Sequence, residues 1–286
     1  MKQSILEKIC VYLLSKGYTV KSLTRTCFDV LARKEDRILL IKILEDANSI
    51  SEAFTKEMKR LSAYINASPV IIAEKAGDKL QNNVVYSRFD IYTLNLSTFK
   101  NCVENKMPFV RRDHAGLTAT IRGDKLKERI EGGEISLGSL SKRLGVSKKM
   151  IQKYESGAKI TINKAFKLYD LMGHSVFDKV EVFSAKQEME HDSKSDVAKK
   201  YTSLGFEAAE TKKTPFNVIA KKGEELILTD VGDKPNPQIK PLSKLIDADS
   251  LVIFKKKKPK NTPSMTKKEF LNFEKAKELI KFLKEY

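Results

Sequence analysis

Four polar side chains fall together on one side of a short stretch in the middle of the chain. On a helical wheel of about 100° per residue that starts at Ser147, they are Lys148, Lys149, Gln152 and Lys153. Lysine can donate to guanine, and glutamine can pair with adenine in the major groove. The chemistry that this set predicts is recognition of base edges in duplex DNA.

The opposite side of the same stretch is apolar. It carries Met150, Ile151 and Tyr154, and Ser147 at its start is a good helix cap. We therefore expect a helix that buries these three side chains and presents its polar side outward.

The residues before Ser147 predict another short helix and a tight turn. Leu137, Leu140 and Leu144 recur at helical spacing, and Gly145 supplies the positive φ that a sharp turn between helices needs. The stretch 136–157 is thus expected to form two short helices separated by a turn.

This stretch resembles the helix-turn-helix of the Cro and lambda-repressor type. The positions that match that family's pattern are Leu140, Ser141, Leu144, Gly145, Val146, Ile151 and Tyr154, followed by Glu155, Ser156 and Gly157. The resemblance implies a DNA-binding domain whose second helix reads the major groove. An ordinary helical hairpin with a solvated basic face is the alternative, but it does not require these features to occur together.

The residues expected to contact DNA lie on the outer sides of the two helices. Lys142 and Arg143 are candidates for the DNA backbone, and Ser147 can donate to a phosphate from the helix N-terminus. The full predicted set is Lys142, Arg143, Ser147, Lys148, Lys149, Gln152 and Lys153. No catalytic residue, metal site or cofactor is expected.

The chain before residue 109 predicts an α/β domain. The expected elements, in order, are a helix over 2–15, strands over 18–23, 27–33 and 37–44, a helix over 50–65, and strands over 69–73, 84–87 and 91–95. This order resembles the restriction-endonuclease-like fold, which includes Holliday-junction resolvases. The resemblance implies an Asp on the second strand and a Glu-x-Lys on the third, which bind a divalent metal for phosphodiester cleavage.

Only part of that metal site is present in this sequence. Asp29 and Lys42 stand at the Asp and Lys positions, but Leu40 stands where the Glu would be, and leucine cannot bind Mg²⁺. We expect a degenerate copy that does not cleave DNA. A plain salt bridge at the end of the strands fits Asp29 and Lys42 equally well.

The first domain has an internal repeat near the end of the chain. Gly17 and Phe28 recur as Gly205 and Phe216, both 188 positions later, and the residues around Leu61 recur 181 positions later. The constant offset predicts a second α/β copy, because chance similarity would not stay in register.

The second copy lacks the catalytic pattern altogether. Asn217 replaces Asp29, Leu228 stands at the Glu position, and Asp230 replaces Lys42. This copy is expected to serve as a scaffold or a contact surface.

The remaining segments carry weaker signals. Linkers are expected over 105–113 and 184–200, and the second leads into a helix. A helix capped by Asp124 is expected over 125–131. A helix over 163–172 is predicted to present Ala165, Phe166, Leu168 and Leu171. A final helix is predicted to begin with a Thr266 and Glu269 capping box and to present Phe270, Phe273, Ala276, Ile280 and Leu283.

A dense cationic run, F-K-K-K-K-P-K, occupies residues 254–260. It suits a segment that contacts phosphates or, in a nucleated cell, a nuclear address. A solvated strand end explains the same residues equally well.

The charge of the whole chain favours polyanionic partners. The formal net charge is +17, which favours nucleic acid or an anionic membrane surface. Cys10, Cys27 and Cys102 are scattered and odd in number, as is typical of a reducing cytosol. No stretch predicts a signal peptide or a membrane span, so a cytoplasmic protein without membrane contact is expected.

Taken over nearly its whole length, the chain resembles a family of archaeal Cro-type transcriptional regulators. The expected domains are a degenerate nuclease-like α/β domain over 1–108, a Cro-type helix-turn-helix domain over 116–182, and a second, repeat-related α/β domain over 192–286. The fold class is α/β plus all-α, with a lambda-repressor-like domain between two restriction-endonuclease-like domains.

The resemblance implies a regulator of transcription that binds double-stranded DNA as a homodimer and is not an enzyme. One alternative is a metal-dependent nuclease or resolvase-like enzyme that the helix-turn-helix delivers to DNA. Another is a bridging protein, since Cro-type domains can contact proteins, although the cationic outer face argues against it.

Overall fold

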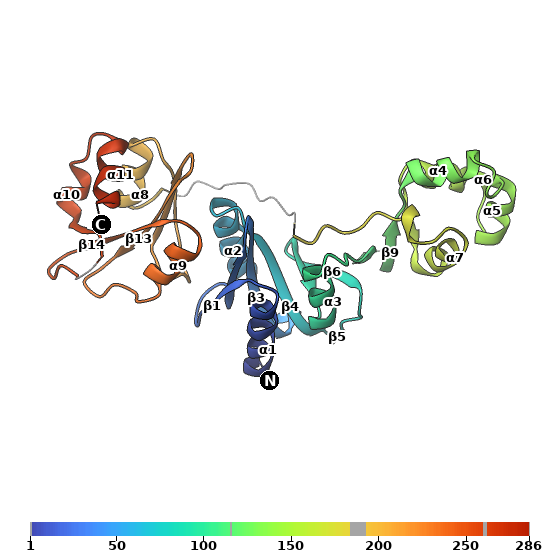
Figure 1. Ribbon diagram of the computed structural model, residues 1–286, viewed down its shortest axis with the longest axis horizontal. Helices are drawn as coiled ribbons and strands as arrows, with labels where there is room; N and C mark the ends of the chain where they lie inside the picture. The colour runs from blue at the N-terminus through green and yellow to red at the C-terminus, as the bar shows by residue number, and fades with distance from the viewer. Residues whose placement is uncertain (1, 115, 184–192, 260–261, 286) are drawn as a thin grey trace. The chain divides into compact units, whose positions relative to one another are not determined.

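The computed structural model describes residues 2–114, 116–183, 193–259 and 262–285 (Figure 1). The chain divides into two compact units. One unit comprises Met1–Glu45, Ser49–Ile71 and Phe183–Tyr286, and the other comprises Asp46–Asn48 and Ile72–Val182.

The N-terminal copy of the repeat is a helix, three antiparallel strands, a crossover helix and a further strand. Its elements are α1 (Lys2–Ser15), β1 (Thr19–Ser22), β2 (Val30–Lys34), β3 (Arg37–Asp46), α2 (Glu52–Tyr64) and β4 (Ser68–Ala76). β3 is central, with β2 on one side and β4 on the other. Its residues Leu39, Leu40 and Ile41 are fully buried, as expected for an apolar strand covered on both faces.

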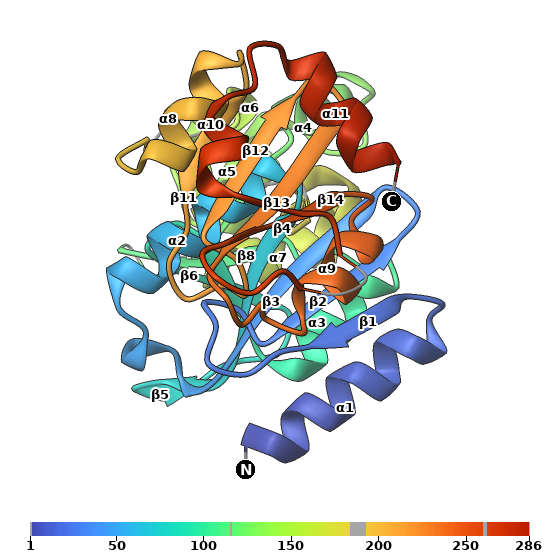
Figure 2. The ribbon, with the colours of Figure 1, turned by 90° about the vertical axis from the view of Figure 1, so that its left-hand side faces the viewer.

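The C-terminal copy repeats this order. Its elements are α8 (Asp196–Ser203), β11 (Glu207–Glu210), β12 (Val218–Lys222), β13 (Glu225–Val231), α9 (Ile239–Leu245), β14 (Asp249–Phe254), β15 (Ser264–Thr266), α10 (Lys267–Leu271) and α11 (Ala276–Lys284). β11, β12 and β13 are antiparallel, whereas β13, β14 and β15 are parallel. Figures 1 and 2 show α8, α10 and α11 over one face of this sheet and α9 over the other.

The two copies share unusual backbone geometry at matching positions. Arg25 and Lys213, which lie 188 positions apart, have φ values of 60° and 56°. Asn66 and Asp247, which lie 181 positions apart, have φ values of 51° and 53°. Because non-glycine residues rarely adopt this conformation, the turns of the two copies are built in the same way.

Matching side-chain hydrogen bonds hold the strands of each copy. The Lys34 ammonium donates to the Lys16 carbonyl and the Lys222 ammonium to the Leu204 carbonyl, both over 2.9 Å. Each bond ties the second strand of a copy to the end of its first helix.

The second unit contains the remaining strands and a cluster of helices. Its elements are β5 (Asp78–Lys79), β6 (Val84–Arg88), β7 (Ile91–Leu94), α3 (Leu96–Val103), β8 (Val110–Asp113), β9 (Gly116–Thr120), α4 (Gly123–Glu131), α5 (Leu137–Leu144), α6 (Lys148–Glu155), β10 (Lys159–Thr161) and α7 (Ile162–Met172). Short 3-10 helices occupy Ala47–Ser49 and His174–Val176. β8 pairs in parallel with β6 and antiparallel with β9, which pairs with β10.

Several expectations about local structure were wrong. The expected linker over 105–113 contains the strand β8. The residue that caps α4 is Arg122, because the helix begins one residue before Asp124. In α7, Phe166 is 59% exposed, and Met172 takes a buried position beside Ala165 and Leu168.

The C-terminal helix was also predicted incompletely. The capping box of Thr266 and Glu269 is confirmed, but the helix that it starts ends at Leu271, and α11 begins at Ala276. Leu279 is buried, whereas Phe273 and Ile280 are only partly buried. Residues 184–192 of the other expected linker lie outside the described residues.

The backbone of α4 packs closely against the end of α6 at Gly123. A Cβ atom at Gly123 would lie 1.9 Å from the Glu155 carbonyl oxygen, whereas one at Gly138 in α5 would meet only the Lys148 side chain at 3.8 Å. We expect Gly123→Ala to lower the free energy of unfolding by about 1–3 kcal/mol, since backbone must shift. Gly138→Ala should raise it by up to about 1 kcal/mol, because alanine favours helix.

Urea unfolding of both full-length variants, followed by circular dichroism, measures these changes. Gly138→Ala is the matched control for adding one methyl group. Equal stability of the two variants would show that α4 does not approach α6 as closely as described.

Candidate nucleic-acid interface

A tight turn joins α5 to α6. Gly145 adopts the left-handed conformation, with φ 65° and ψ 46°. The Val146 amide donates to the Ser141 carbonyl over 3.1 Å, and the Ser141 hydroxyl donates back to the Val146 carbonyl over 2.5 Å. The small residue at position 141 therefore closes the turn with its own side chain, a role that its size alone did not indicate.

Serine side chains cap both helices. The Ser136 hydroxyl accepts from the Ser139 amide over 3.1 Å, and the Ser147 hydroxyl accepts from the Met150 amide over 3.2 Å. These bonds satisfy amides that a helix N-terminus otherwise leaves without an acceptor.

The apolar sides of both helices meet in one core. Leu140, Leu144, Ile151 and Tyr154 are at most 3% exposed, and they pack with buried residues of α4 and α7. Burial raises the pKa of the Tyr154 hydroxyl. Met150 was expected in this core but is 36% exposed, because it lies in the first turn of α6.

The polar sides of both helices face outward. All seven residues predicted to contact DNA are exposed: Lys142, Arg143, Ser147, Lys148, Lys149, Gln152 and Lys153. We refer to these seven exposed residues as the basic face of α5–α6.

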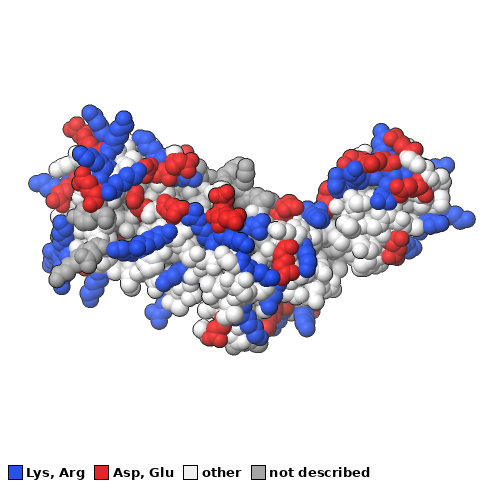
Figure 3. Space-filling model, in the orientation of Figure 1, with Lys and Arg blue, Asp and Glu red and all other residues white. Residues whose placement is uncertain are grey.

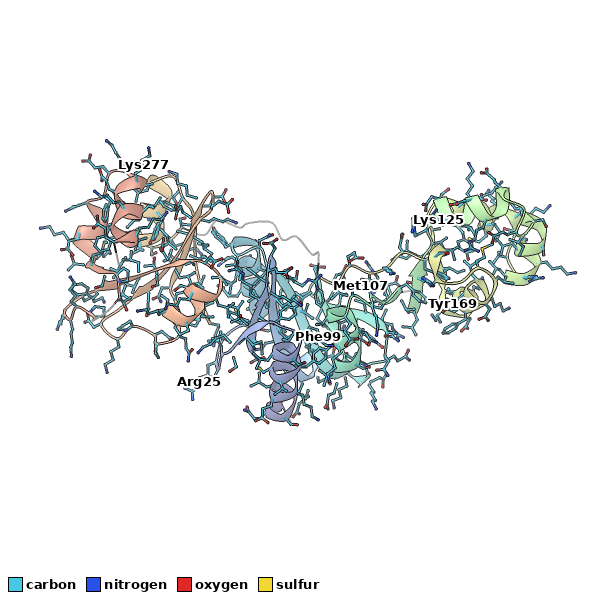
Figure 4. All side chains as sticks on the ribbon, viewed as in Figure 1. Arg25, Phe99, Met107, Lys125, Tyr169 and Lys277 are labelled. Atoms are coloured by element: carbon cyan, nitrogen blue, oxygen red, sulfur yellow. The ribbon has the colours of Figure 1, made fainter. Side chains whose placement is uncertain are left out.

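The cations of α4 behave differently from those of the basic face. The α4 region forms ion pairs between Arg122 and Asp124, Lys125 and Glu128, Lys127 and Glu131, and Arg129 and Glu134, with distances of 3.1, 2.6, 3.6 and 2.7 Å. Within the described ranges, the five cations of the basic face form no ion pair. Figure 4 labels Lys125 on α4 and Tyr169 on α7, which belong to the same helical cluster.

The position of two lysines on α6 is electrostatically unfavourable. Lys148 and Lys149 lie in the first turn, which carries no acidic residue. A helix N-terminus has a partial positive charge and favours anions. An anion bound there would be attracted by both side chains and by the helix.

The nuclease-like positions of the first copy form a closed ion pair. The Lys42 ammonium lies 3.4 Å from Asp29 Oδ1, and both side chains are about nine-tenths buried, at 10% and 9% exposure. Asp29 Oδ2 accepts from the Ile43 amide over 2.8 Å, and the Lys42 ammonium donates to the Thr26 carbonyl over 2.9 Å. Leu40 at the remaining position is fully buried.

The second copy packs beside this ion pair. The Cys27 amide donates to the Lys213 carbonyl over 2.7 Å, and the Lys212 amide donates to the Glu57 carboxylate over 3.0 Å. The ammonium groups of Lys42 and Lys213 lie 5.4 and 5.5 Å from the centre of the Phe54 ring. Lys212 and Lys213 could not be identified from the sequence, because contacts between the copies leave no local pattern.

The second copy has the hydrogen bond from a backbone amide but not the ion pair. Asn217 Oδ1 accepts from the Val231 amide over 2.7 Å, at the positions that match Asp29 and Ile43. Burial raises the pKa of the Asp230 carboxyl, which accepts from the Asn236 amide over 2.7 Å. Among the described residues, no group of three or more His, Cys, Asp or Glu side chains is placed to hold a metal.

The chain is similar to archaeal proteins along its whole length. A protein from Methanocaldococcus jannaschii is 32% identical over 99% of this chain and 96% of its own, and it is named "Putative HTH-type transcriptional regulatory protein". Proteins of the same name from Archaeoglobus fulgidus and Methanosarcina barkeri are 28% and 29% identical, over 98% and 97% of their lengths.

Residues 2–108 match the model of a PD-(D/E)XK superfamily domain. This match confirms the nuclease-like fold expected at the N-terminus. No solved structure shows significant similarity to the chain. In the described part of the chain, no helix is long and apolar enough to cross a membrane.

The ion pair between Asp29 and Lys42 is expected to be structural. Asp29→Ala should lower the free energy of unfolding by about 3–5 kcal/mol, because it leaves a buried ammonium without its partner. Asp29→Asn should cost less, since the asparagine of the second copy makes the same bond to a backbone amide. Chemical unfolding of the two variants measures the difference; equal losses would contradict this account of the site.

Proposed function

Because this chain belongs to the family of archaeal helix-turn-helix (HTH)-type transcriptional regulatory proteins, we propose that it is a sequence-specific DNA-binding regulator of transcription. In this proposal α5 and α6 form a Cro-type helix-turn-helix, and α6 enters the major groove. The observation that carries it is the basic face of α5–α6, where five exposed cations form no ion pair with any residue that the structure describes, although neighbouring cations of the α4 region form them.

The residues of the basic face divide into two roles. Lys148, Lys149, Gln152 and Lys153 contact bases or the adjacent phosphates, because they lie along the exposed side of α6. Lys142 and Arg143 on α5, with the hydroxyl of Ser147, contact the DNA backbone and fix the orientation of α6.

We further propose that the protein acts as a homodimer. Two copies of α6 related by a two-fold axis would read two half-sites about one helical turn of DNA apart. The α/β copies that precede and follow the helical domain in the sequence serve as scaffold and are not catalytic.

Selection of bound sequences from a random duplex pool tests the proposal. The protein should enrich a motif with two related half-sites. Lys148→Ala combined with Lys149→Ala should abolish most of this enrichment, and Gln152→Ala should relax preference at one position, which corresponds to about 1–3 kcal/mol.

A matched control comes from the paired lysines of α4. Lys125→Ala combined with Lys127→Ala removes the same charge from a neighbouring helix and should leave the motif intact. The α6 variant should unfold at the same or a higher temperature than the unmodified chain, because it removes cations from a helix N-terminus. A motif that survives in the α6 variant would contradict α6 as the reading helix.

The match to a PD-(D/E)XK domain supports one other candidate, a metal-dependent nuclease. We expect no cleavage of branched or linear DNA with Mg²⁺ or Mn²⁺, because Leu40 occupies a ligand position and no carboxylate cluster replaces it within the described residues. The assay includes Asp29→Asn as its control. Cleavage by the unmodified protein that this variant loses would establish the nuclease and exclude the scaffold role.

A further inference from the structure

The cationic run of the second copy begins where β14 ends. Lys255, Lys256, Lys257 and Lys258 follow Phe254 directly, and all four are exposed. No ion pair engages Lys255, Lys256 or Lys257 in the part of the chain that the structure describes. Figure 3 shows Lys and Arg side chains gathered on the side of this copy where β14 ends.

A carboxylate holds the backbone of this run in a defined turn. Asp233 Oδ1 accepts from the amides of Lys255, Lys256 and Lys257, over 2.6, 2.8 and 3.4 Å. These backbone bonds, with that of Lys256 foremost, lower the pKa of the Asp233 carboxyl. The amides are therefore satisfied internally, and the lysine side chains extend from a fixed backbone rather than from a frayed strand end.

The turn lies at the carboxyl ends of two parallel strands. β13 and β14 run parallel, so the loop that carries Asp233 and the lysine run meet at their carboxyl ends. In open α/β sheets, ligands bind beyond the carboxyl ends of the strands. β13 also carries Leu228 and Asp230, which match the nuclease positions of the first copy.

The first copy has no such run. The residues 181 positions earlier, Glu74 to Gly77, include one lysine and one glutamate and lie in or next to β4. The lysine run is therefore a property of the second copy alone and does not follow from the shared fold.

We propose that the run from Lys255 to Lys258, held by Asp233, is a second DNA-binding surface that contacts the phosphate backbone without reading sequence. This inference rests on the proposed function in one respect, that the chain binds duplex DNA. Ammonium groups bind phosphate as point charges and release condensed counterions, which strengthens binding to any sequence. The basic face of α5–α6 would select the site, and the lysine run would add affinity.

The salt dependence of DNA binding by the full-length chain tests the proposal. Lys255→Gln, Lys256→Gln and Lys257→Gln are combined in one variant, and fluorescence anisotropy follows binding to a duplex of arbitrary sequence between about 50 and 300 mM KCl. Each lost phosphate contact should flatten the log–log slope by about 0.9, so a total change of about 2–3 is expected.

A control with the same change of charge comes from α11 and the residue that caps it, Lys275. Lys275, Lys277 and Lys281 are exposed on the same copy, and Lys277 is labelled in Figure 4. Their combined replacement by Gln should leave the slope within error of the unmodified chain. An unchanged slope in the site variant, or an equal change in both variants, would overturn the proposal.

Asp233→Ala tests the role of the turn. Removing a negative charge by itself strengthens binding to DNA, so weaker binding by this variant would show that Asp233 positions the lysines. Unchanged or stronger binding would overturn that positioning.

The two proposals fail in different ways. If the slope changes as expected but no sequence motif is enriched, the second surface stands and sequence-specific regulation fails. If a motif is enriched but the slope is unaffected, sequence-specific binding stands and the second surface fails.

Discussion

The turn at Gly145 decides what the basic residues of this protein can reach. Because Ser141 and Val146 exchange two hydrogen bonds across it, α5 and α6 have one relative orientation. That orientation places Leu144 and Ile151 in a common core and leaves the polar side of α6 exposed. A change in the turn would shift the basic residues of α6 relative to those of α5, so the proposed recognition of DNA depends on this turn.

The two α/β copies show which part of their shared pattern is structural. In the first copy a carboxylate at Asp29 accepts from the Ile43 amide, and in the second copy Asn217 accepts from Val231. The acceptor is present in both copies although its charge is not, because a buried amide needs a partner whatever the function of the fold. The charge at Asp29 has a local use, since it neutralises Lys42.

The sequence was most informative where one residue determines local geometry. Gly145, the Ser147 cap and the Thr266 capping box could be identified because each acts within a few residues, whereas the Ser136 cap was not predicted. Met150 and Phe166 were wrongly expected to be buried. A helical wheel gives the direction of a side chain around the helix axis, but it does not show how far along the helix the core extends. The contacts of Lys212 and Lys213 with the first copy join residues more than 150 positions apart, and no local pattern encodes them.

The distribution of charge connects stability with recognition. On α4, cations and carboxylates at helical spacing neutralise one another and stabilise the helix. On α6, Lys148 and Lys149 oppose the helix dipole and have no acidic neighbour in the first turn. This arrangement disfavours the free helix, and an anion bound at the N-terminus of α6 would offset that cost. In the proposed complex with DNA, the phosphate backbone would supply beside α6 the negative charge that Glu128 and Glu131 supply on α4.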